Sequence, residues 1–359
     1  MKDLHRRQFL RRAALVAAGA RFAGMRATGE AAAAVPAPDP VPVPGALPPA
    51  ATGGALQRRP FGRTGAEVSL LGLGGHAIGK AGSQAEATRI VQEAVDAGVT
   101  FMDNAWEYHD GRSEEWMGAA LAGRRDQVFL MTKVCTHGGD GRQAIEQLEQ
   151  SLKRLRTDHL DLWQVHEVIY DNDPDLHFRP GGVVDALSEA KRQGKTRFVG
   201  FTGHKDPAIH LKMLSHDFPF DSCQLPLNAF DGSFRSFEER VLPELVRRGI
   251  APIAMKSLGG TGEAVKQGAL SVNEALRYVL SLPIATLVSG IDSLDVLQQN
   301  VAIAASFAPM SPSEMAALRQ RCAQVAADGR FELYKTSKKF DGEPGRRNHG
   351  FPLQPELPA

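Results

Sequence analysis

The feature that most constrains this chain is a repeated alternation between short apolar runs and longer stretches of helical periodicity, from residue 66 to residue 306. Short apolar runs are typical of buried strands, and amphipathic stretches between them are typical of covering helices. The runs predict eight strands, at residues 69–74, 100–105, 128–134, 160–168, 196–204, 222–228, 251–258 and 285–291. Helices are expected between them, for example at residues 84–98, 142–158 and 183–194. Eight strand–helix units in about 240 residues predict an α/β fold of the (β/α)₈ TIM barrel type, with a doubly wound open sheet as the alternative.

The first 34 residues differ from the rest of the chain. Arg6 and Arg7 precede a short apolar stretch that ends in a run of alanines, which is typical of a twin-arginine secretory signal. Arg21 and Arg26 interrupt the apolar part, so no stable membrane span is expected. We therefore expect the twin-arginine export machinery as a partner and the periplasm as the location of the exported protein. Export by this route implies folding before transport, often around a bound cofactor.

Composition also indicates where the linker, the folded domain and the C-terminal tail begin and end. Residues 35–55 are rich in Pro and Ala and predict a linker. Residues 56–335 should form the barrel domain, with an N-terminal hairpin and a C-terminal helical extension. Residues 336–359 are polar and rich in Gly and Pro, which predicts a tail that wraps the surface or stays mobile.

Charge and cysteine content exclude some classes of protein. The net charge of +1 over 359 residues gives no electrostatic indication of nucleic acid or of an anionic membrane as a partner. The three cysteines are an odd count in a large domain, so a disulfide framework is not expected. Cys135 and Cys223 are predicted to be small buried hydrophobic residues.

A glycine-rich segment, GLGGHA, matches the dinucleotide fingerprint G-x-G-x-x-G/A at Gly72, Gly74 and Ala77. The fingerprint requires a helix that begins inside the loop and points its N-terminus at the pyrophosphate. Helical periodicity begins here only near Ser83. The segment is therefore interpreted as a loop at the barrel mouth.

Four polar residues stand at or near the ends of neighbouring predicted strands: Asp103, Tyr108, Lys133 and His166. Each alone has an ordinary structural explanation, but the carboxyl ends of barrel strands meet at one face. A phenol is a poor proton donor or acceptor at neutral pH, and a neighbouring ammonium is expected to lower its pKa. A carboxylate would hold the ammonium, and an imidazole would hold a substrate oxygen. The set predicts protonation of an oxygen while hydride reaches the adjacent carbon.

The region from about Leu56 to Phe307 resembles the aldo-keto reductase superfamily. The resemblance rests on PFGRTGAEVSLLGLGG, GVTFMDNAWEYHDGRSEEWMG, VFLMTKV and LDLWQVH, which occur in the family's order. It implies a (β/α)₈ barrel that binds NAD or NADP without a Rossmann domain. It also implies reduction of a small-molecule aldehyde or ketone to an alcohol, or the reverse, with a catalytic tetrad of Asp103, Tyr108, Lys133 and His166. Tyr108 would be the general acid/base.

The resemblance implies cofactor contacts at Thr202, Gln224, Met255, Lys256, Ser289, Gly290, Asp292 and Asn300. Gln224 would hold the nicotinamide carboxamide, and Asn300 would contact the adenine. Near the nicotinamide, this chain departs from the family pattern at Gly203, where an Asn is usual, and at Met255, where many members stack a Tyr. Lys256 would pair with cofactor phosphates or remain a solvated lysine at a strand end.

The segment SGIDSLDVLQQN resembles the loop and helix that hold the adenosine phosphates. Its start at Ser289 and Gly290 suits a helix N-terminus that accepts phosphate. Asp292 stands where NADP-selective members place basic residues, and an aspartate would repel a 2′-phosphate. This favours NAD(H), whereas the family pattern favours NADP(H), so both stay open.

Two other classes of function are open. A metal-dependent hydrolase barrel would use Asp103 with His76, His109, His166 and His204, but no H-x-H pair follows the first strand, and we assign no residue to a metal. A non-enzymatic barrel would keep its nicotinamide cofactor as a redox sensor or docking subunit. The substrate is not indicated: four loop aromatics would form partly aromatic walls or pack locally, namely Tyr170, Phe178, Phe230 and Phe234.

Overall fold

The computed structural model describes residues 56–138, 140–353 and 356. The predicted signal at 1–34 and the predicted linker at 35–55 lie outside the described residues.

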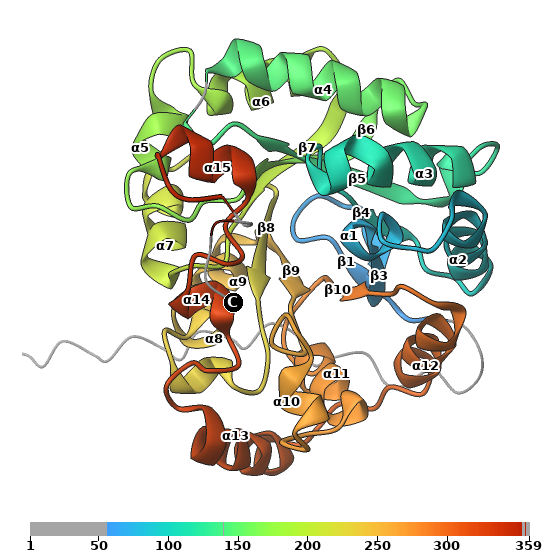
Figure 1. The fold of residues 1–359 in the computed structure, drawn as a ribbon, viewed down its shortest axis with the longest axis vertical. Coiled ribbons are helices and arrows are strands. Elements are labelled where there is room, and N and C mark those ends of the chain that lie inside the picture. Colours follow the sequence, from blue (N-terminus) through green and yellow to red (C-terminus); the bar gives the residue numbers. More distant parts are fainter. Residues whose placement is uncertain (1–55, 139, 354–355, 357–359) are drawn as a thin grey trace, which may run out of the picture. The chain divides into compact units, whose positions relative to one another are not determined.

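Eight parallel strands close into a barrel in the order β10-β3-β4-β5-β6-β7-β8-β9 (Figure 1). The strands are β3 (Leu71–Gly74), β4 (Phe101–Asp103), β5 (Phe129–Cys135), β6 (Leu160–His166), β7 (Thr196–Thr202), β8 (Ser222–Pro226), β9 (Ala251–Met255) and β10 (Thr286–Gly290). Each lies within or overlaps one of the eight predicted apolar runs. The (β/α)₈ prediction is confirmed, and closure between β10 and β3 excludes the open sheet.

An antiparallel hairpin of β1 (Arg58–Pro60) and β2 (Glu67–Ser69) precedes the barrel, as predicted. Between its strands, Phe61 is fully buried, and its ring centroid lies 4.8 Å from that of Phe129 at the start of β5. The hairpin therefore closes the barrel at the amino ends of the strands and leaves the carboxyl ends for a site.

The helices that follow the strands carry apolar residues on the faces that they bury, as their amphipathic patterns predict. The longer ones are α2 (Gln84–Asp96), α3 (Arg112–Ala120), α4 (Gly141–Leu155), α6 (Val183–Arg192), α7 (Pro207–Ser215), α9 (Leu242–Arg248), α11 (Val272–Leu280), α12 (Leu294–Ala305) and α13 (Pro312–Ala326). Short helices are α1 (Gly75–Ile78), α5 (Asp173–Phe178), α8 (Phe237–Arg240), α10 (Glu263–Lys266), α14 (Leu333–Thr336) and α15 (Glu343–Asn348), with 3₁₀ turns η1 (Tyr108–Gly111), η2 (Arg125–Gln127) and η3 (Asp231–Ser233). None of the described helices has the length and apolarity needed to cross a bilayer.

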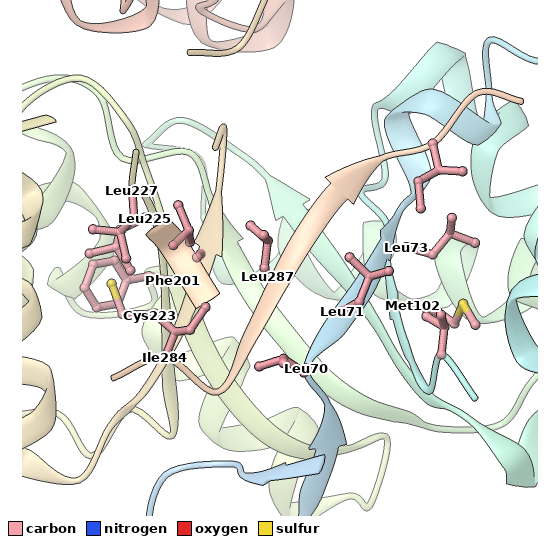
Figure 2. Close-up of a cluster of buried hydrophobic side chains, with 14 of the residues drawn as sticks. Leu70, Leu71, Leu73, Met102, Phe201, Cys223, Leu225, Leu227, Ile284 and Leu287 are labelled. Carbon is pink, nitrogen blue, oxygen red and sulfur yellow. The ribbon is translucent and has the colours of Figure 1, made fainter. Parts of the chain in front are cut away.

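Buried apolar side chains form two clusters. The larger one joins the strands to the surrounding helices, and Figure 2 shows part of it, including Leu73 of β3, Met102 of β4 and Leu287 of β10. The smaller one joins the hairpin to strand residues such as Phe101 and Met131. Both clusters serve to fix the strands that present polar residues at the carboxyl end.

The glycine-rich loop after β3 differs from its prediction in one detail. It contains a single helical turn, α1, where no helix was expected, and the Ser113 hydroxyl donates to the Gly75 carbonyl at 2.6 Å. One turn is too short to produce a periodic pattern. The next helix begins at Gln84 with Ser83 as its N-cap, as the sequence predicts. The closed barrel excludes a Rossmann fold at this loop.

The chain after α13 returns to the carboxyl end of the barrel, where α14 and α15 lie (Figure 1). The Gly342 amide donates to Glu167 Oε1 at 2.5 Å, and Asn348 Nδ2 donates to the Thr136 carbonyl at 2.7 Å. Asp341 and Arg346 are buried. The described part of the predicted tail therefore packs on the loops that follow β5 and β6.

Candidate active site

Strands β4, β5 and β6 are neighbours in the barrel, and they bring three of the four predicted catalytic residues together. Lys133 Nζ lies 2.8 Å from Asp103 Oδ1 and 2.9 Å from Oδ2. It also donates to the Asn104 carbonyl at 2.7 Å. Both side chains of this ion pair are nearly inaccessible, at 1% and 3% exposed. The ammonium is therefore held rigidly at the strand ends.

Tyr108 stands in the loop after β4, at the first residue of η1. His109 and Asp110 adopt left-handed backbone angles, with φ of 54° and 57°, which turn the chain sharply behind Tyr108. The phenol oxygen lies 3.5 Å from Lys133 Nζ, and the ring meets that of His166 edge-on with centroids 5.7 Å apart. The structure thus brings all four predicted tetrad residues together.

The electrostatics of Tyr108 differ from the sequence prediction. Burial, together with the negative charges of Asp103 and Glu107, raises the pKa of Tyr108 well above its ordinary value. The prediction that Lys133 lowers this pKa is wrong, because desolvation and the carboxylates outweigh the ammonium. Burial also lowers the pKa of Lys133, although Asp103 opposes this shift. Tyr108 is therefore a protonated phenol, suited to donating a proton.

Glu107, next to Tyr108 in the chain, is a site residue that sequence reasoning missed. Its Oε1 lies 3.0 Å from His166 Nδ1. Burial would raise the pKa of Glu107, but the contact with His166 lowers it to about 2. Burial lowers the pKa of His166. We therefore describe the pair as a neutral imidazole that faces a carboxylate through Nδ1, which leaves Nε2 free of Glu107.

Cys135 was predicted to be a small buried hydrophobic residue, and this prediction is wrong in one respect. Its side chain is buried, but its Sγ donates to Glu107 Oε2 at 2.7 Å and lies 2.8 Å from His137 Nε2. Cys223, in contrast, packs within the large apolar cluster, as predicted. All three cysteines lie in the described part of the chain, and each is free. The signal for the polar contacts was the C-x-H spacing directly after Lys133.

More charged groups surround the mouth. Glu167 Oε2 lies 3.5 Å from His204 Nδ1. Lys256, at the end of β9 with a φ of 59°, places its Nζ 5.5 Å from the ring centroid of Tyr334. Burial lowers the pKa of Lys256, and Glu167 opposes that shift. Lys256 is half-buried, and both its pairing with cofactor phosphates and its alternative as a solvated lysine stay predictions.

The loop aromatics pack locally. Phe230 is fully buried, with its centroid 5.3 Å from that of Phe331, and Phe178 stacks on His216 at 4.0 Å. Tyr170 packs against His349 of the C-terminal segment, at 4.1 Å between centroids. Phe234 contacts Gly329 closely. These four side chains therefore pack against other parts of the protein.

The residues predicted to hold a nicotinamide ring lie beside the tetrad. Gln224 in β8 pairs in register with Thr202 in β7, and its Nε2 donates to Asp103 Oδ2 at 2.8 Å. Its Oε1 is buried and has no hydrogen-bond partner among the described residues. Met255, at the end of β9, is half-buried. A Cβ at Gly203 would lie only 2.3 Å from the Val168 carbonyl, so the family's usual Asn has no room at this position.

The residues predicted to hold the adenosine end lie on β10 and α12. Asn300 Nδ2 donates to Ser289 Oγ at 3.0 Å, and Asn300 Oδ1 is buried with no partner among the described residues. Ser289 and Gly290 end the strand β10, within the strand predicted at residues 285–291. The helix α12 begins only at Leu294, so the two residues do not form its N-terminus. The helix is capped by Ser293, which accepts from the Val296 amide at 3.3 Å. The exposed Asp292 directly precedes this cap.

The ligand set of the alternative hydrolase does not form. His76 and His109 are neighbours, with ring centroids 4.8 Å apart. Across the described residues, the one group of His, Cys, Asp or Glu side chains close enough to share a metal is Glu107, Cys135 and His137. Neither Asp103 nor any of the four histidines weighed for a hydrolase belongs to it.

A sequence model of the aldo/keto reductase family matches residues 70–270. The "Uncharacterized oxidoreductase YqkF" of Bacillus subtilis is 25% identical over 309 residues, which cover 75% of this chain and 97% of that protein. The "Aldo-keto reductase YhdN" of the same organism is 35% identical over 195 residues, 50% of this chain and 55% of that protein. A solved aldo-keto reductase from Klebsiella pneumoniae in complex with NADPH aligns with a TM-score of 0.61 at 22% identity, over 75% of this chain and 96% of that one.

Proposed function

This chain belongs to the aldo/keto reductase family, and we propose that it reduces an aldehyde or ketone to an alcohol, or catalyses the reverse, with a nicotinamide cofactor and with Tyr108 as general acid/base. One observation carries the proposal: the Tyr108 phenol, the Lys133–Asp103 ion pair and the His166 imidazole converge at the carboxyl ends of β4, β5 and β6. Family membership alone supports an oxidoreductase; the roles of these four residues are our proposal.

Two buried hydrogen-bond acceptors support the proposal that a nicotinamide cofactor binds here. Gln224 Oε1 beside the tetrad and Asn300 Oδ1 on α12 have no partners among the described residues. A buried acceptor without a partner is costly, and the amide hydrogens of a carboxamide and the amino group of an adenine would satisfy them. Gln224 would hold the nicotinamide end and Asn300 the adenine end. When bound, the reduced cofactor supplies the hydride.

The identity of the cofactor is proposed as NAD or NADP. The exposed carboxylate of Asp292 before α12 favours NAD(H), because it would repel a 2′-phosphate. The Klebsiella protein of the same fold binds NADPH, which favours NADP(H).

Residues of this chain donate the proton, stabilise the developing charge and bind the substrate oxygen. Tyr108 donates its proton to the oxygen of the carbonyl, and its raised pKa keeps that proton in place until an acceptor arrives. Lys133, fixed by Asp103, faces the phenol oxygen and stabilises negative charge that develops on it. His166, whose Nδ1 faces Glu107, has Nε2 available for the substrate oxygen.

Reduction is tested by mixing purified full-length protein, loaded with NADH or NADPH, with a panel of aldehydes, ketones and quinones in a stopped-flow instrument. Loss of nicotinamide absorbance in a single turnover is the expected result. No loss with any compound would contradict the reductase and favour the non-enzymatic alternative, a nicotinamide-binding redox sensor or docking subunit.

We also propose that residues 1–34 direct export by the twin-arginine machinery to the periplasm, with the nucleotide already bound. The Arg6–Arg7 pair ahead of a short apolar stretch supports this. The test is fractionation of cells that express the wild type or a variant with both arginines changed to lysine. The wild type should be periplasmic and should release a nicotinamide nucleotide on denaturation, which mass spectrometry detects. A cytoplasmic wild type would contradict export, and periplasmic protein without nucleotide would contradict loading before transport.

A further inference from the structure

Three side chains with metal-binding atoms converge beside the tetrad without being part of it. They are Glu107 in the loop after β4, Cys135 at the end of β5, and His137 two residues later. Cys135 Sγ lies 2.7 Å from Glu107 Oε2 and 2.8 Å from His137 Nε2, and all three ligand atoms lie within 4.8 Å of one another. The separations of 2.7 Å and 2.8 Å are hydrogen-bond distances. Ligand atoms around a tetrahedral Zn²⁺ lie about 3.5 Å apart, so a bound ion would replace these hydrogen bonds and move the three side chains slightly apart.

The chemistry of the three groups is that of a zinc site. Thiolate, imidazole nitrogen and carboxylate oxygen are the ligands that Zn²⁺ prefers, and a site with three protein ligands keeps a fourth position open. Binding of Zn²⁺ would displace the thiol proton of Cys135 to solvent, and the resulting thiolate and the Glu107 carboxylate would together neutralise the divalent cation. Cys135 and His137 are buried, at 1% and 2% exposed, so hydration cannot compensate such charges at this place.

We propose that Glu107, Cys135 and His137 bind a Zn²⁺ ion next to the tetrad. The two oxygens of Glu107 divide between the proposed ion and the tetrad: Oε2 faces Cys135, and Oε1 faces His166 Nδ1 at 3.0 Å. The carboxylate therefore lies between the proposed ion and His166, whose Nδ1 has no hydrogen-bond partner of good geometry among the described residues. Binding of Zn²⁺ would hold Glu107 in place so that Oε1 can accept from this nitrogen. Glu107 is on this account a positioning residue for His166.

The C-terminal segment covers this cluster. A Cβ at Gly345 would lie 2.6 Å from His137 Nδ1, so the backbone of α15 passes directly over the imidazole. Asn348 Nδ2 donates to the carbonyl of Thr136, the residue between Cys135 and His137. Packing from α15 therefore holds the C-x-H loop in the conformation that presents both ligands, and a side chain larger than hydrogen at Gly345 would displace it.

The test is metal analysis of the full-length protein, purified without a histidine tag and dialysed against a weak chelator. Inductively coupled plasma mass spectrometry should find an equimolar amount of zinc in the wild type. Cys135→Ser and His137→Gln should lose it. Cys223→Ser is the matched control, because that cysteine is also buried but packs among apolar side chains, and it should retain the zinc.

A second measurement keeps the test valid if a variant is unstable. Protein from which zinc was removed is titrated with Co²⁺, and thiolate coordination is read from the thiolate-to-cobalt charge-transfer absorption. The band should appear in the wild type and in Cys223→Ser and be absent in folded Cys135→Ser, with folding checked by circular dichroism. A wild type that binds neither Zn²⁺ nor Co²⁺, or a Cys135→Ser variant that keeps its zinc, would overturn the proposal. These readouts are independent of hydride transfer, so the metal site and the proposed reductase fail or stand separately.

Discussion

The described residues include two buried lysine–carboxylate clusters, each with a tyrosine, and the two clusters differ in how many of their polar atoms have hydrogen-bond partners. The first is the tetrad of Asp103, Tyr108, Lys133 and His166. The second, which we call the C-terminal cluster, consists of Asn228, Asp231, Glu332, Tyr334 and Lys335. The second joins α14 to the loop after β8.

In the C-terminal cluster every strong donor is paired. Lys335 Nζ lies 2.8 Å from Asp231, 2.9 Å from Glu332 and 2.7 Å from the Phe234 carbonyl. Tyr334 OH donates to Glu332 at 2.7 Å and accepts from Asn228 at 2.9 Å. In the tetrad, the phenol oxygen of Tyr108 has only Lys133, at 3.5 Å. The same residue types thus form a fully hydrogen-bonded structural cluster around Lys335. Around Lys133 they leave the Tyr108 hydroxyl free to donate to a substrate.

The largest expected effect is the difference in turnover between Tyr108→Phe and Tyr334→Phe. Tyr108→Phe removes the proton donor, and the turnover number should fall by about 10²- to 10⁴-fold, while the affinity for the nicotinamide cofactor stays close to that of the wild type. Tyr334→Phe should keep turnover near the wild-type value. Steady-state assays and cofactor titration by fluorescence measure both. Equal turnover in the two variants would contradict a catalytic role for the tetrad and a structural role for the C-terminal cluster.

The next effect separates the lysines by stability. Lys335→Met leaves Asp231 and Glu332 buried without their cation, and the free energy of unfolding should fall by about 3–5 kcal/mol. Urea denaturation measures this change. The folded fraction of Lys335→Met should turn over substrate at the wild-type rate, so a stable variant, or one that is folded but inactive, would show that this cluster is not a structural staple.

A smaller loss of stability is expected for Tyr334→Phe. Removal of the hydroxyl leaves Asn228 and Glu332 each without one partner in a fully buried place, at a cost of about 1–3 kcal/mol in the free energy of unfolding. The same substitution at Tyr108 should change stability less, because that hydroxyl makes only one long contact. The two variants are compared by urea denaturation, and a larger loss in Tyr108→Phe would contradict the comparison.

The cofactor end gives a weaker effect. Asp292 is exposed, so solvent screens the interaction between its charge and a cofactor phosphate, and a change of that charge should have a small effect on affinity. Asp292→Arg should raise the affinity for NADPH relative to NADH by a factor of about 5, as expected for about 1 kcal/mol from an exposed ion pair. Fluorescence titration with both cofactors measures the ratio. An unchanged ratio would place the 2′-position away from this residue.

The smallest effect is an absence of pH dependence. The pKa of Tyr108 is raised well above its ordinary value, so its protonated form, which donates in reduction, persists throughout the neutral and mildly alkaline range. The single-turnover rate of reduction should not decline through Tyr108 between pH 7 and the ordinary phenol pKa of about 10. A decline in the wild-type rate with its midpoint in that interval, without a matching loss of cofactor affinity, would contradict the raised pKa.

Much of the fold and of the tetrad was predictable from the sequence. Each strand is a compact apolar run bounded by turn residues, and adjacent barrel strands necessarily bring their carboxyl ends together. Asp103, Lys133 and His166 could therefore be located from strand ends alone. The helix start near Ser83 was also predictable, because an N-cap serine leaves a local signal.

The rest depends on contacts between distant parts of the chain. The C-x-H spacing of Cys135 and His137 was visible in the sequence, but Glu107 lies 28 positions before Cys135 and no pattern links it to the pair, so the three-residue site could not be predicted. Lys335 and Asp231 are 104 positions apart, and the polar tail that carries α15 gives no periodic signal. The sign of the pKa shift at Tyr108 was missed because it depends on burial and on Glu107, which strand patterns do not report.

The most direct test of the central claim follows deuterium from reduced nicotinamide, labelled at the transferable position, into the alcohol product, with wild type, Tyr108→Phe and Tyr334→Phe loaded to equal occupancy. Mass spectrometry of the product from a single turnover reports both the transfer and its rate. We predict deuterated alcohol at equal rates from the wild type and Tyr334→Phe, and almost none from Tyr108→Phe. Deuterated alcohol formed by Tyr108→Phe at the wild-type rate would contradict Tyr108 as the proton donor.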